Sequence, residues 1–315
     1  MPFNNLISRT EVQALVREQV SDIMLNDLQN SSAAMQLFNR IDVPTNQTRF
    51  PVISALPTAY FVTGDTGVKQ TTEVNWANKY LDIEEIAAIV PVPDSVLEDA
   101  SFDIFGAVRP LLQNAIARTL DAAIFFGTNK PAAWPTDITT SSVAAGNVVA
   151  RGTATGPQGG IAEDFNQLLA KLENDGYAAT AAVANQTLRA RLRSARGTDG
   201  QMLMDVNGGT NNIWGVPTAY PLVGQWPTGL SAAETFALQA ENFILGVRRD
   251  FTVTIHNEGV ITDGAGLIQY NLMQQDMTAI RIVFRAGWQV SNPMNYQEGV
   301  EANRYPAAVM RSPAA

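Results

Sequence analysis

The sequence lacks cysteine entirely and has a single histidine, His256. Without thiols the chain cannot form disulfides, thiolate metal sites, iron–sulfur clusters or a cysteine nucleophile. One imidazole also removes most of the remaining metal and acid–base chemistry. His256 lies between strand-like residues 254–255 and a turn at 258–259, which indicates a strand-end residue rather than a catalytic one. We therefore expect no catalytic, cofactor-binding or metal-binding residue.

Positive charge is also scarce. Only four of the 21 basic side chains are lysines, and 30 acidic side chains give a formal net charge of −9. Such an acidic chain is poorly suited to binding dominated by phosphate contacts, so we expect any contact with DNA to be non-specific. The 46% apolar content is typical of a globular protein, and the apolar residues are too interspersed for a membrane span. The first ten residues lack the apolar core of an export signal, which predicts a protein made and used in a cytoplasm.

Three further motifs favour ordinary structural roles. The glycine-rich segment 156–160 lacks the Gly-Lys-Ser/Thr ending of a phosphate loop. Residues 205–208 begin like a calcium loop but lack its later ligands, so we interpret them as a turn. The one basic run contains Arg189, Arg191, Arg193 and Arg196. A solvated helix face with acidic neighbours is the simplest interpretation of this run, and phosphate contact is the alternative.

Residues 1–47 are typical of an arm rather than a domain. A helix is predicted from Ser8, and its apolar residues recur at three- and four-residue steps along one face. The stripe consists of Val12, Leu15, Val16, Val20, Ile23, Met24 and Leu28. It needs a partner, either a neighbouring chain or its own subunit.

Residues 48–82 predict a long hairpin. Strands are expected at 60–63 and 68–76, joined by the turn residues 64–67. A two-stranded ribbon is only marginally stable alone in water. Because this ribbon carries Tyr60, Phe61 and Trp76, we expect its aromatic side chains to dock on another surface.

The rest of the chain mixes helices and strands, which predicts the α+β class. Residues 83–92 form a near-continuous apolar run and are expected to be a buried strand. A 26-residue helix is predicted at 101–126, about 39 Å long and ended by Gly127. A long loop is expected at 129–160. Further helices are predicted at 161–175 and after the cap Asn185, and strands at 178–184, 213–217, 243–247, 251–255 and 279–290.

In this order, the features resemble the major capsid protein of tailed bacteriophages with the Hong Kong 97 fold. The residues that carry the resemblance are RFPV at 49–52, PTAYF at 57–61, WAN at 76–78, Leu81, IAAIVPVP at 86–93, LDAAIFFG at 120–127, IWGVP at 213–217, and Ile280, Arg281, Arg285, Gly287 and Pro293. The resemblance implies an N-terminal arm (1–47), an extended loop (48–82) and a peripheral domain (83–176 and 269–300) with a spine helix (101–126) and an excursion (129–160). It also implies an axial domain (177–268) and a C-terminal tail (301–315).

The resemblance implies a structural subunit that self-assembles as pentamers and hexamers into an icosahedral shell around double-stranded DNA. It would be located in the virion and assembled in the host cytoplasm, with a separate scaffolding protein, a portal and decoration proteins as possible partners. An encapsulin-like nanocompartment with a protein cargo is the alternative, and an enzyme of unrelated fold is a third hypothesis. The candidate intersubunit contacts are Val12, Leu15, Val16, Val20, Ile23, Leu28, Tyr60, Phe61, Lys69 and Trp76.

One chemical feature of the family's founding member is expected to be missing, namely an isopeptide crosslink between a loop lysine and a neighbour's asparagine. Lys69 lies in the hairpin. Aligning Arg285 and Pro293 with the family pattern places Asp276 at the asparagine position and Val283 at the position of the glutamate that promotes the reaction. A carboxylate is a poor acyl donor to an amine near neutral pH, and valine cannot act as a base.

Overall fold

The computed structural model describes residues 32–62, 67–100, 103–155, 159–196, 211–221 and 226–313, with the backbone alone at 249–251. Two compact units divide the chain. The first contains Glu85–Thr119 and Arg249–Ala286, and the second contains Ser32–Glu84, Leu120–Arg248 and Gly287–Ala315. In the described part of the chain, no helix has the length and apolar character needed to cross a membrane.

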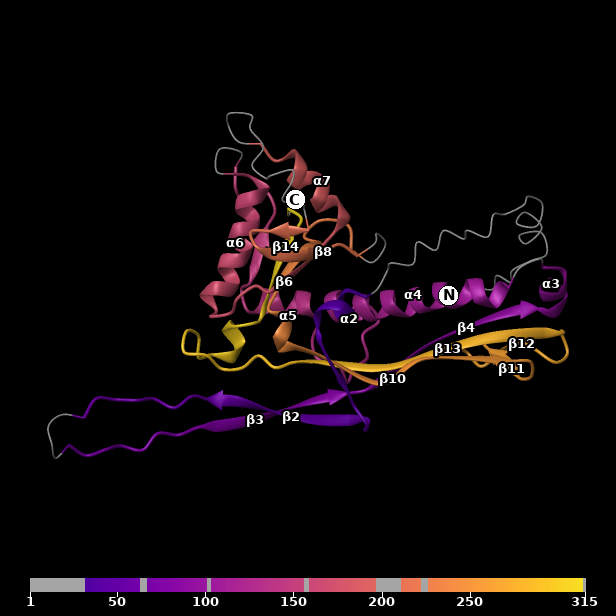
Figure 1. Ribbon diagram of the computed structural model, residues 1–315, viewed down its shortest axis with the longest axis horizontal. Helices are drawn as coiled ribbons and strands as arrows, with labels where there is room; N and C mark the ends of the chain where they lie inside the picture. Colours follow the sequence, from indigo (N-terminus) through magenta and orange to yellow (C-terminus); the bar gives the residue numbers. More distant parts are fainter. Residues whose placement is uncertain are drawn as a thin grey trace. The chain divides into compact units, whose positions relative to one another are not determined.

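A six-stranded sheet forms the centre of the second unit (Figure 1). Its strands, in spatial order, are β5 (Val148–Ala150), β14 (Ala307–Arg311), β9 (Ala233–Leu238), β6 (Ala181–Ala184), β8 (Val216–Ala219) and β7 (Asn212–Ile213). β14 pairs antiparallel with β9 and parallel with β5. The predicted C-terminal tail at 301–315 therefore contains a buried strand with a partner on each side. No local pattern in the sequence reveals this pairing, because the paired residues lie far apart in the chain.

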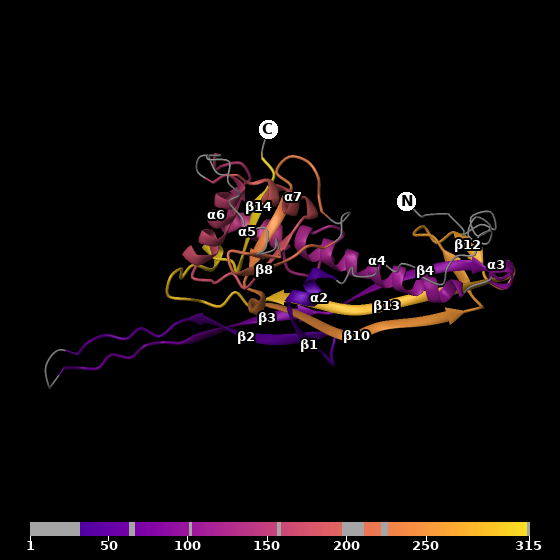
Figure 2. The same ribbon diagram turned by 45° about the horizontal axis from the view of Figure 1, so that its top comes forward.

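Two helices pack on this sheet, and both begin as predicted. α6 (Ile161–Asn174) buries Phe165, Leu168 and Leu172 in the sheet's hydrophobic core, and it ends before Gly176, whose φ is +80°. α7 (Gln186–Ser194) is capped by Asn185, whose side chain accepts a hydrogen bond from the Thr187 backbone N–H at 3.1 Å. The two helices lie side by side in both views (Figure 1, Figure 2).

Residues 129–160 were expected to be a long loop, and this prediction is wrong for the described part of that range. The range contains α5 (Ile138–Ala144) and strand β5. The Asp137 carboxylate caps α5 by accepting a hydrogen bond from the Thr140 N–H at 2.9 Å. α5 has the small, polar composition ITTSSVA, which produces no apolar periodicity. Its stability comes from this cap and from packing against β14.

A cluster of aromatic rings also fills the second unit. Phe125 and Phe126, at the end of α4 (Ile104–Phe126), contact Phe236 of β9 with ring centroids 5.2 and 5.8 Å apart. Phe38, which follows the short helix α2 (Ala33–Leu37), stacks on Phe243 at 5.0 Å. α4 starts three residues later than predicted, with residues 101–102 outside the described part, and Gly127 ends it with φ +69° as expected.

The hairpin consists of β2 (Gln47–Ala55) and β3 (Asn75–Asp82), which pair antiparallel (Figure 2). Strands had been predicted further out, at 60–63 and 68–76, and among the described residues of these ranges only 75–76 belong to a strand, so the placement is wrong for the rest. The ladder forms at the base, where one of its faces rests on the protein. Beyond the base the two segments of the hairpin continue without a backbone ladder, and the Tyr296 hydroxyl donates a hydrogen bond to the Pro57 carbonyl at 2.9 Å. Two-stranded ribbons are only marginally stable in water.

The first unit contains parts of three long elements that continue into the second unit: α4, β10 (Phe243–His256) and β13 (Met277–Val290). β10 and β13 belong to a four-stranded sheet of order β1-β10-β13-β4, with β1 (Asn39–Asp42) and β4 (Glu84–Pro93) at its edges. His256 ends β10, as predicted. The remaining elements are α3 (Asp94–Asp99), β11 (Val260–Thr262), β12 (Ile268–Asn271), and short 3-10 helices at Ala240–Asn242 and Glu301–Asn303.

The apolar run at 83–92 was expected to be fully buried, and this prediction is wrong. Exposure alternates along β4, and only Val92 in this strand is fully buried, whereas Ile89 is about half exposed. Side chains of a strand alternate between the two faces of its sheet, so one face of β4 packs on the protein and the other is open. The open face of β4 carries Glu85, Ala87 and Ile89, and Glu85 pairs with Arg285.

Candidate interaction surface

The base of the hairpin has two different faces, set by the register of β2 and β3. One face carries Val52 opposite Ala77 and Thr48 opposite Leu81. Leu81 is completely buried and Val52 nearly so. The other face carries Ile53 opposite Trp76, and Tyr80 follows Trp76 at the period of two that places strand residues on one side. These three side chains are 40%, 65% and 48% exposed.

Close packing fixes which face is buried. A Cβ on Gly287 would collide with the backbone carbonyl of Asp82, and a Cβ on Gly246 would lie 2.7 Å from the Leu81 side chain. Both glycines therefore let the end of β3 approach the strands beneath it. The Gln289 Nε2 donates to the Tyr80 carbonyl at 2.6 Å, and Lys79 pairs with Glu301 at 2.9 Å. The hairpin is thus held firmly at its base.

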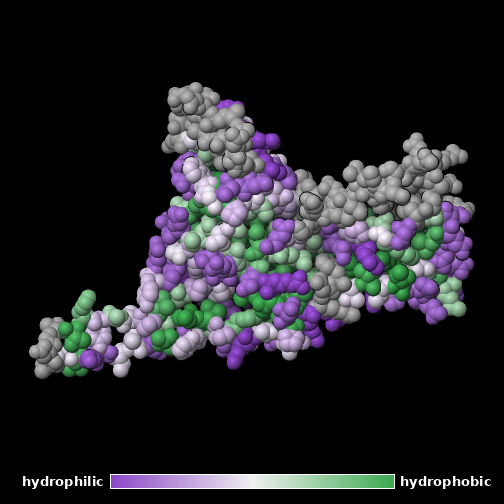
Figure 3. Space-filling view, viewed as in Figure 1, coloured by the Kyte–Doolittle hydropathy of each residue, from purple (hydrophilic) through white to green (hydrophobic). Residues whose placement is uncertain are grey.

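Side chains, rather than a ladder, connect the two halves of the outer hairpin. The Tyr60 hydroxyl donates to the Gln70 carbonyl at 2.7 Å, and the Thr58 N–H donates to the Thr72 hydroxyl at 2.9 Å. The ring of Phe61 is fully exposed and Val68 is 84% exposed. Hydrophobic side chains gather at the far end of the projecting hairpin (Figure 3). A monomer in water gains nothing from such a surface, which is typical of an interaction site.

Four of the candidate contacts, Tyr60, Phe61, Lys69 and Trp76, are exposed on this hairpin, and their contact with another subunit stays a prediction. Sequence reasoning missed Ile53 and Tyr80, which complete the outer face with Trp76. The period of two around Trp76 could have revealed Tyr80, whereas Ile53 could be found only from the pairing register. The six arm candidates from Val12 to Leu28 lie outside the described residues.

The start of α2 is held by one buried carboxylate. Both oxygens of Asp121, which lies on α4, accept hydrogen bonds, one from the Ala33 N–H at 2.7 Å and the other from the Ala34 N–H at 3.2 Å. The Ser32 hydroxyl donates to the same carboxylate. Burial raises the pKa of Asp121 to about 6, although these three donors oppose the shift. This anchor holds the point where residue 32 enters the second unit.

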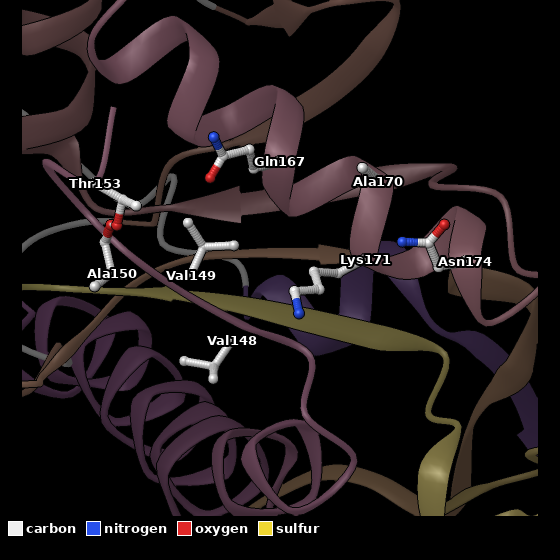
Figure 4. Close-up of a pocket in the computed structure, with 8 residues that line it drawn as sticks. All are labelled: Val148, Val149, Ala150, Thr153, Gln167, Ala170, Lys171 and Asn174. Atoms are coloured by element: carbon white, nitrogen blue, oxygen red, sulfur yellow. The ribbon is translucent and has the colours of Figure 1, made fainter. Parts of the chain in front are cut away.

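Two cavities flank helix α6. The first, of about 290 Å³, lies between β5 and α6 and contains Lys171 as its one ionisable lining group (Figure 4). The second, of about 370 Å³, lies between α6 and α7 and is lined by Arg151, Arg191 and Arg196. Neither has the nucleophile and positioned base of a hydrolytic site. Among the described residues there is no group of three His, Cys, Asp or Glu side chains that could hold a metal ion.

The residues aligned with the crosslinking chemistry have ordinary structural roles. Asp276 lies in the turn before β13 with φ +47°, and its carbonyl accepts a hydrogen bond from the Asp94 N–H at 2.9 Å. Val283 is buried in β13. The Asp276 carboxylate is not the amide that the crosslink would need, and the Val283 side chain cannot act as a base.

The chain was compared with known families and structures. A model of the phage capsid family matches residues 13–295. A chain from the solved structure of Microbacterium phage Oxtober96 is 34% identical with a TM-score of 0.82, covering 98% of this chain and 100% of its own. One from Mycobacterium phage Adephagia is 27% identical with a TM-score of 0.82, covering 99% of each chain. The capsid of a native GTA particle is 17% identical with a TM-score of 0.68, covering 96% of both chains. No curated protein matches.

Proposed function

The chain belongs to the phage capsid family, and from this premise we propose that the hairpin of each subunit lies on a neighbouring copy in an icosahedral head shell. The chain is a phage major capsid protein with mixed helices and sheets, located in the virion capsid as part of an oligomeric shell. The encapsulin alternative is not favoured, because the matches are to phage capsids. In the proposal, pentamers and hexamers of this subunit enclose double-stranded DNA.

We further propose the Hong Kong 97 arrangement for this fold. The hairpin corresponds to the extended loop, α4 to the spine helix of a peripheral domain, and the region around the six-stranded sheet to an axial domain. The role is structural rather than enzymatic. Assembly in the host cytoplasm, and help from a separate scaffolding protein, a portal and decoration proteins, belong to the same proposal.

One observation carries the proposal: the hairpin exposes a set of large apolar side chains while its base is anchored tightly. Ile53, Trp76 and Tyr80 form one open face, and Phe61 and Val68 lie further out. Burying one such side chain is worth about 1.5–3 kcal/mol, so several buried at each of many identical contacts would stabilise a closed shell. The six arm residues Val12, Leu15, Val16, Val20, Ile23 and Leu28 are proposed to contribute in the same way.

The test compares two tryptophans of similar exposure. Trp76 on the hairpin is 65% exposed, and Trp214, in the tight turn between β7 and β8, is 60% exposed. Trp76→Ala is expected to abolish or strongly reduce shell formation, measured by negative-stain microscopy and sedimentation, while Trp214→Ala assembles normally. Equal yields for both variants would contradict the proposal. Unfolding of each free subunit by urea checks that both variants are folded.

A gel test addresses the covalent chemistry. Without an asparagine at 276 or a glutamate at 283, mature particles boiled in detergent should run as a single 34.0 kDa band. A ladder of multimers would show that Lys69 or another lysine is crosslinked after all. In the expected case, the shell depends on non-covalent burial.

A further inference from the structure

The cavity between α6 and α7 is lined by three arginines. Arg151 follows β5, Arg191 lies in the last turn of α7, and Arg196 follows that helix. Asp164, in the first turn of α6, forms part of the opposite wall. We call this hollow the arginine pocket.

Glu234 on β9 neutralises only part of this charge. Its Oε2 accepts hydrogen bonds from Arg151 Nε at 2.7 Å and from Arg191 at 2.8 Å, so two guanidinium groups share one carboxylate oxygen. A guanidinium has five N–H donors arranged as a fork. Each of these arginines therefore keeps further donors that can bind a second carboxylate.

Among the described residues, arginines at the pocket outnumber carboxylates by one. Asp164 is buried, and its two oxygens accept from the Gly152 N–H at 2.7 Å and the Ala154 N–H at 2.8 Å. It shapes the wall of the pocket and is not directed at an arginine. In the described part of the chain, Arg196 donates to the backbone carbonyls of Arg193 and Ala195, at 3.2 and 3.4 Å. Within the residues that the structure describes, the three guanidinium groups of the pocket are accompanied by two carboxylates, Asp164 in the lining and Glu234 beside Arg151 and Arg191.

We propose that the arginine pocket binds an acidic side chain from a second copy of this chain during shell assembly. This inference rests on the proposed function, because it requires contact between copies. Each copy carries a formal net charge of −9, so copies repel one another over most of their surfaces. A positive hollow on such a subunit attracts the acidic surface of the next copy and gives the contact a defined orientation. DNA phosphate is less favoured, because the whole subunit repels DNA.

The experiment reverses one charge in the pocket and one beside it. Arg196→Glu changes a lining residue that does not contact Glu234. Arg193→Glu is the matched control, because Arg193 is exposed on α7, the helix that Arg196 follows, and does not line the pocket. The assembly rate of the full-length subunit is followed by light scattering at low and high salt. Arg196→Lys retains the charge and tests whether the fork is needed.

We expect Arg196→Glu to slow assembly about fivefold more than Arg193→Glu at low salt, and we expect the gap to narrow at high salt, where charges are screened. Arg196→Lys should lie between wild type and Arg196→Glu. Equal rates for the two glutamate variants would overturn the inference. So would an unchanged assembly rate together with weaker binding of a short double-stranded DNA by Arg196→Glu, which would assign the pocket to phosphate.

The outcomes separate this inference from the proposed function. If wild-type subunits form shells and Trp76→Ala does not, the hairpin proposal stands whatever the arginine variants do. If the arginine variants behave alike in that same preparation, only the pocket inference fails. Equal urea midpoints for the free subunits show that the arginine variants are folded, so a slower rate reports on contact between copies.

Discussion

The hairpin and the six-stranded sheet belong to the same compact unit, yet they use apolar residues in opposite ways. All four residues of β6 are buried, and so are five of the six residues of β9. β2 and β3 bury one side chain each, Val52 and Leu81, and leave Trp76 open. Apolar residues of the sheet stabilise the subunit, whereas those of the hairpin's outer face are open to solvent, as expected of the docking surface proposed above.

The largest expected effect comes from the sheet side of this comparison. Phe236 is fully buried and contacts three other aromatic rings. Phe236→Ala should lower the free energy of unfolding of the subunit by about 3–5 kcal/mol, because it leaves a cavity. Urea denaturation followed by tryptophan fluorescence measures the change. A loss below about 1 kcal/mol would mean that the sheet core is not the main source of subunit stability.

The second effect is a pH dependence in the anchor of α2. The folded pKa of Asp121, about 6, lies above its ordinary value of 3.8. Its contribution to stability is therefore fully present below about pH 4 and is lost as the pH rises through 6, by about 3 kcal/mol at most. The stability of Asp121→Asn should fall less steeply between pH 4 and pH 7 than that of the wild type. Parallel pH profiles from urea unfolding would exclude a raised pKa.

The third effect tests how the hairpin base is held. Gly287→Ala places a methyl group against the Asp82 carbonyl and should destabilise the subunit by about 1–3 kcal/mol, or displace the end of β3. Gly264→Ala is the matched control, because nothing lies within 4 Å of its Cβ position. Thermal unfolding of both variants decides the matter. Equal melting temperatures would mean that β3 is not anchored through Gly287.

The smallest expected effect completes the comparison. Trp76→Ala should change the stability of the free subunit by no more than about 0.5 kcal/mol, because the side chain is largely in solvent before assembly. Hydrogen exchange adds a second measure, since amides at 58–62 and 67–72 should exchange far faster than those of β14. Slow exchange in the outer hairpin of free subunits would show that its docking surface lies within the same chain.

Local signals in the sequence predicted much of the fold. The apolar spacing of α6, the Asn185 cap and the stop at Gly127 each depend on residues within one or two turns, so the sequence reveals them directly. The exposed aromatic residues of the hairpin were predictable for a different reason. Tyr60, Phe61 and Trp76 are too large and apolar for a solitary ribbon, so the mismatch itself indicated an interaction site.

Distant pairings escaped prediction. β5 and β9, the two strands that pair with β14, both lie more than 60 residues before it in the sequence. No periodic pattern in the sequence indicates that these strands pair. α5 has no apolar stripe, so its position depends on a cap and a neighbouring strand. The arginine pocket could also not be recognised without the fold, because Arg151, Arg191 and Glu234 come together only when the end of β5, α7 and β9 meet.

The position of β14 inside its sheet also governs when the subunit can finish folding during synthesis. The ribosome makes β9 first and reaches β14 almost 70 residues later, roughly 4 to 14 seconds at ordinary translation rates. Until then β5 and β9 cannot be joined through the strand that lies between them. A nascent or truncated chain thus lacks a closed sheet, and only a chain synthesised past residue 311 can become a rigid building block.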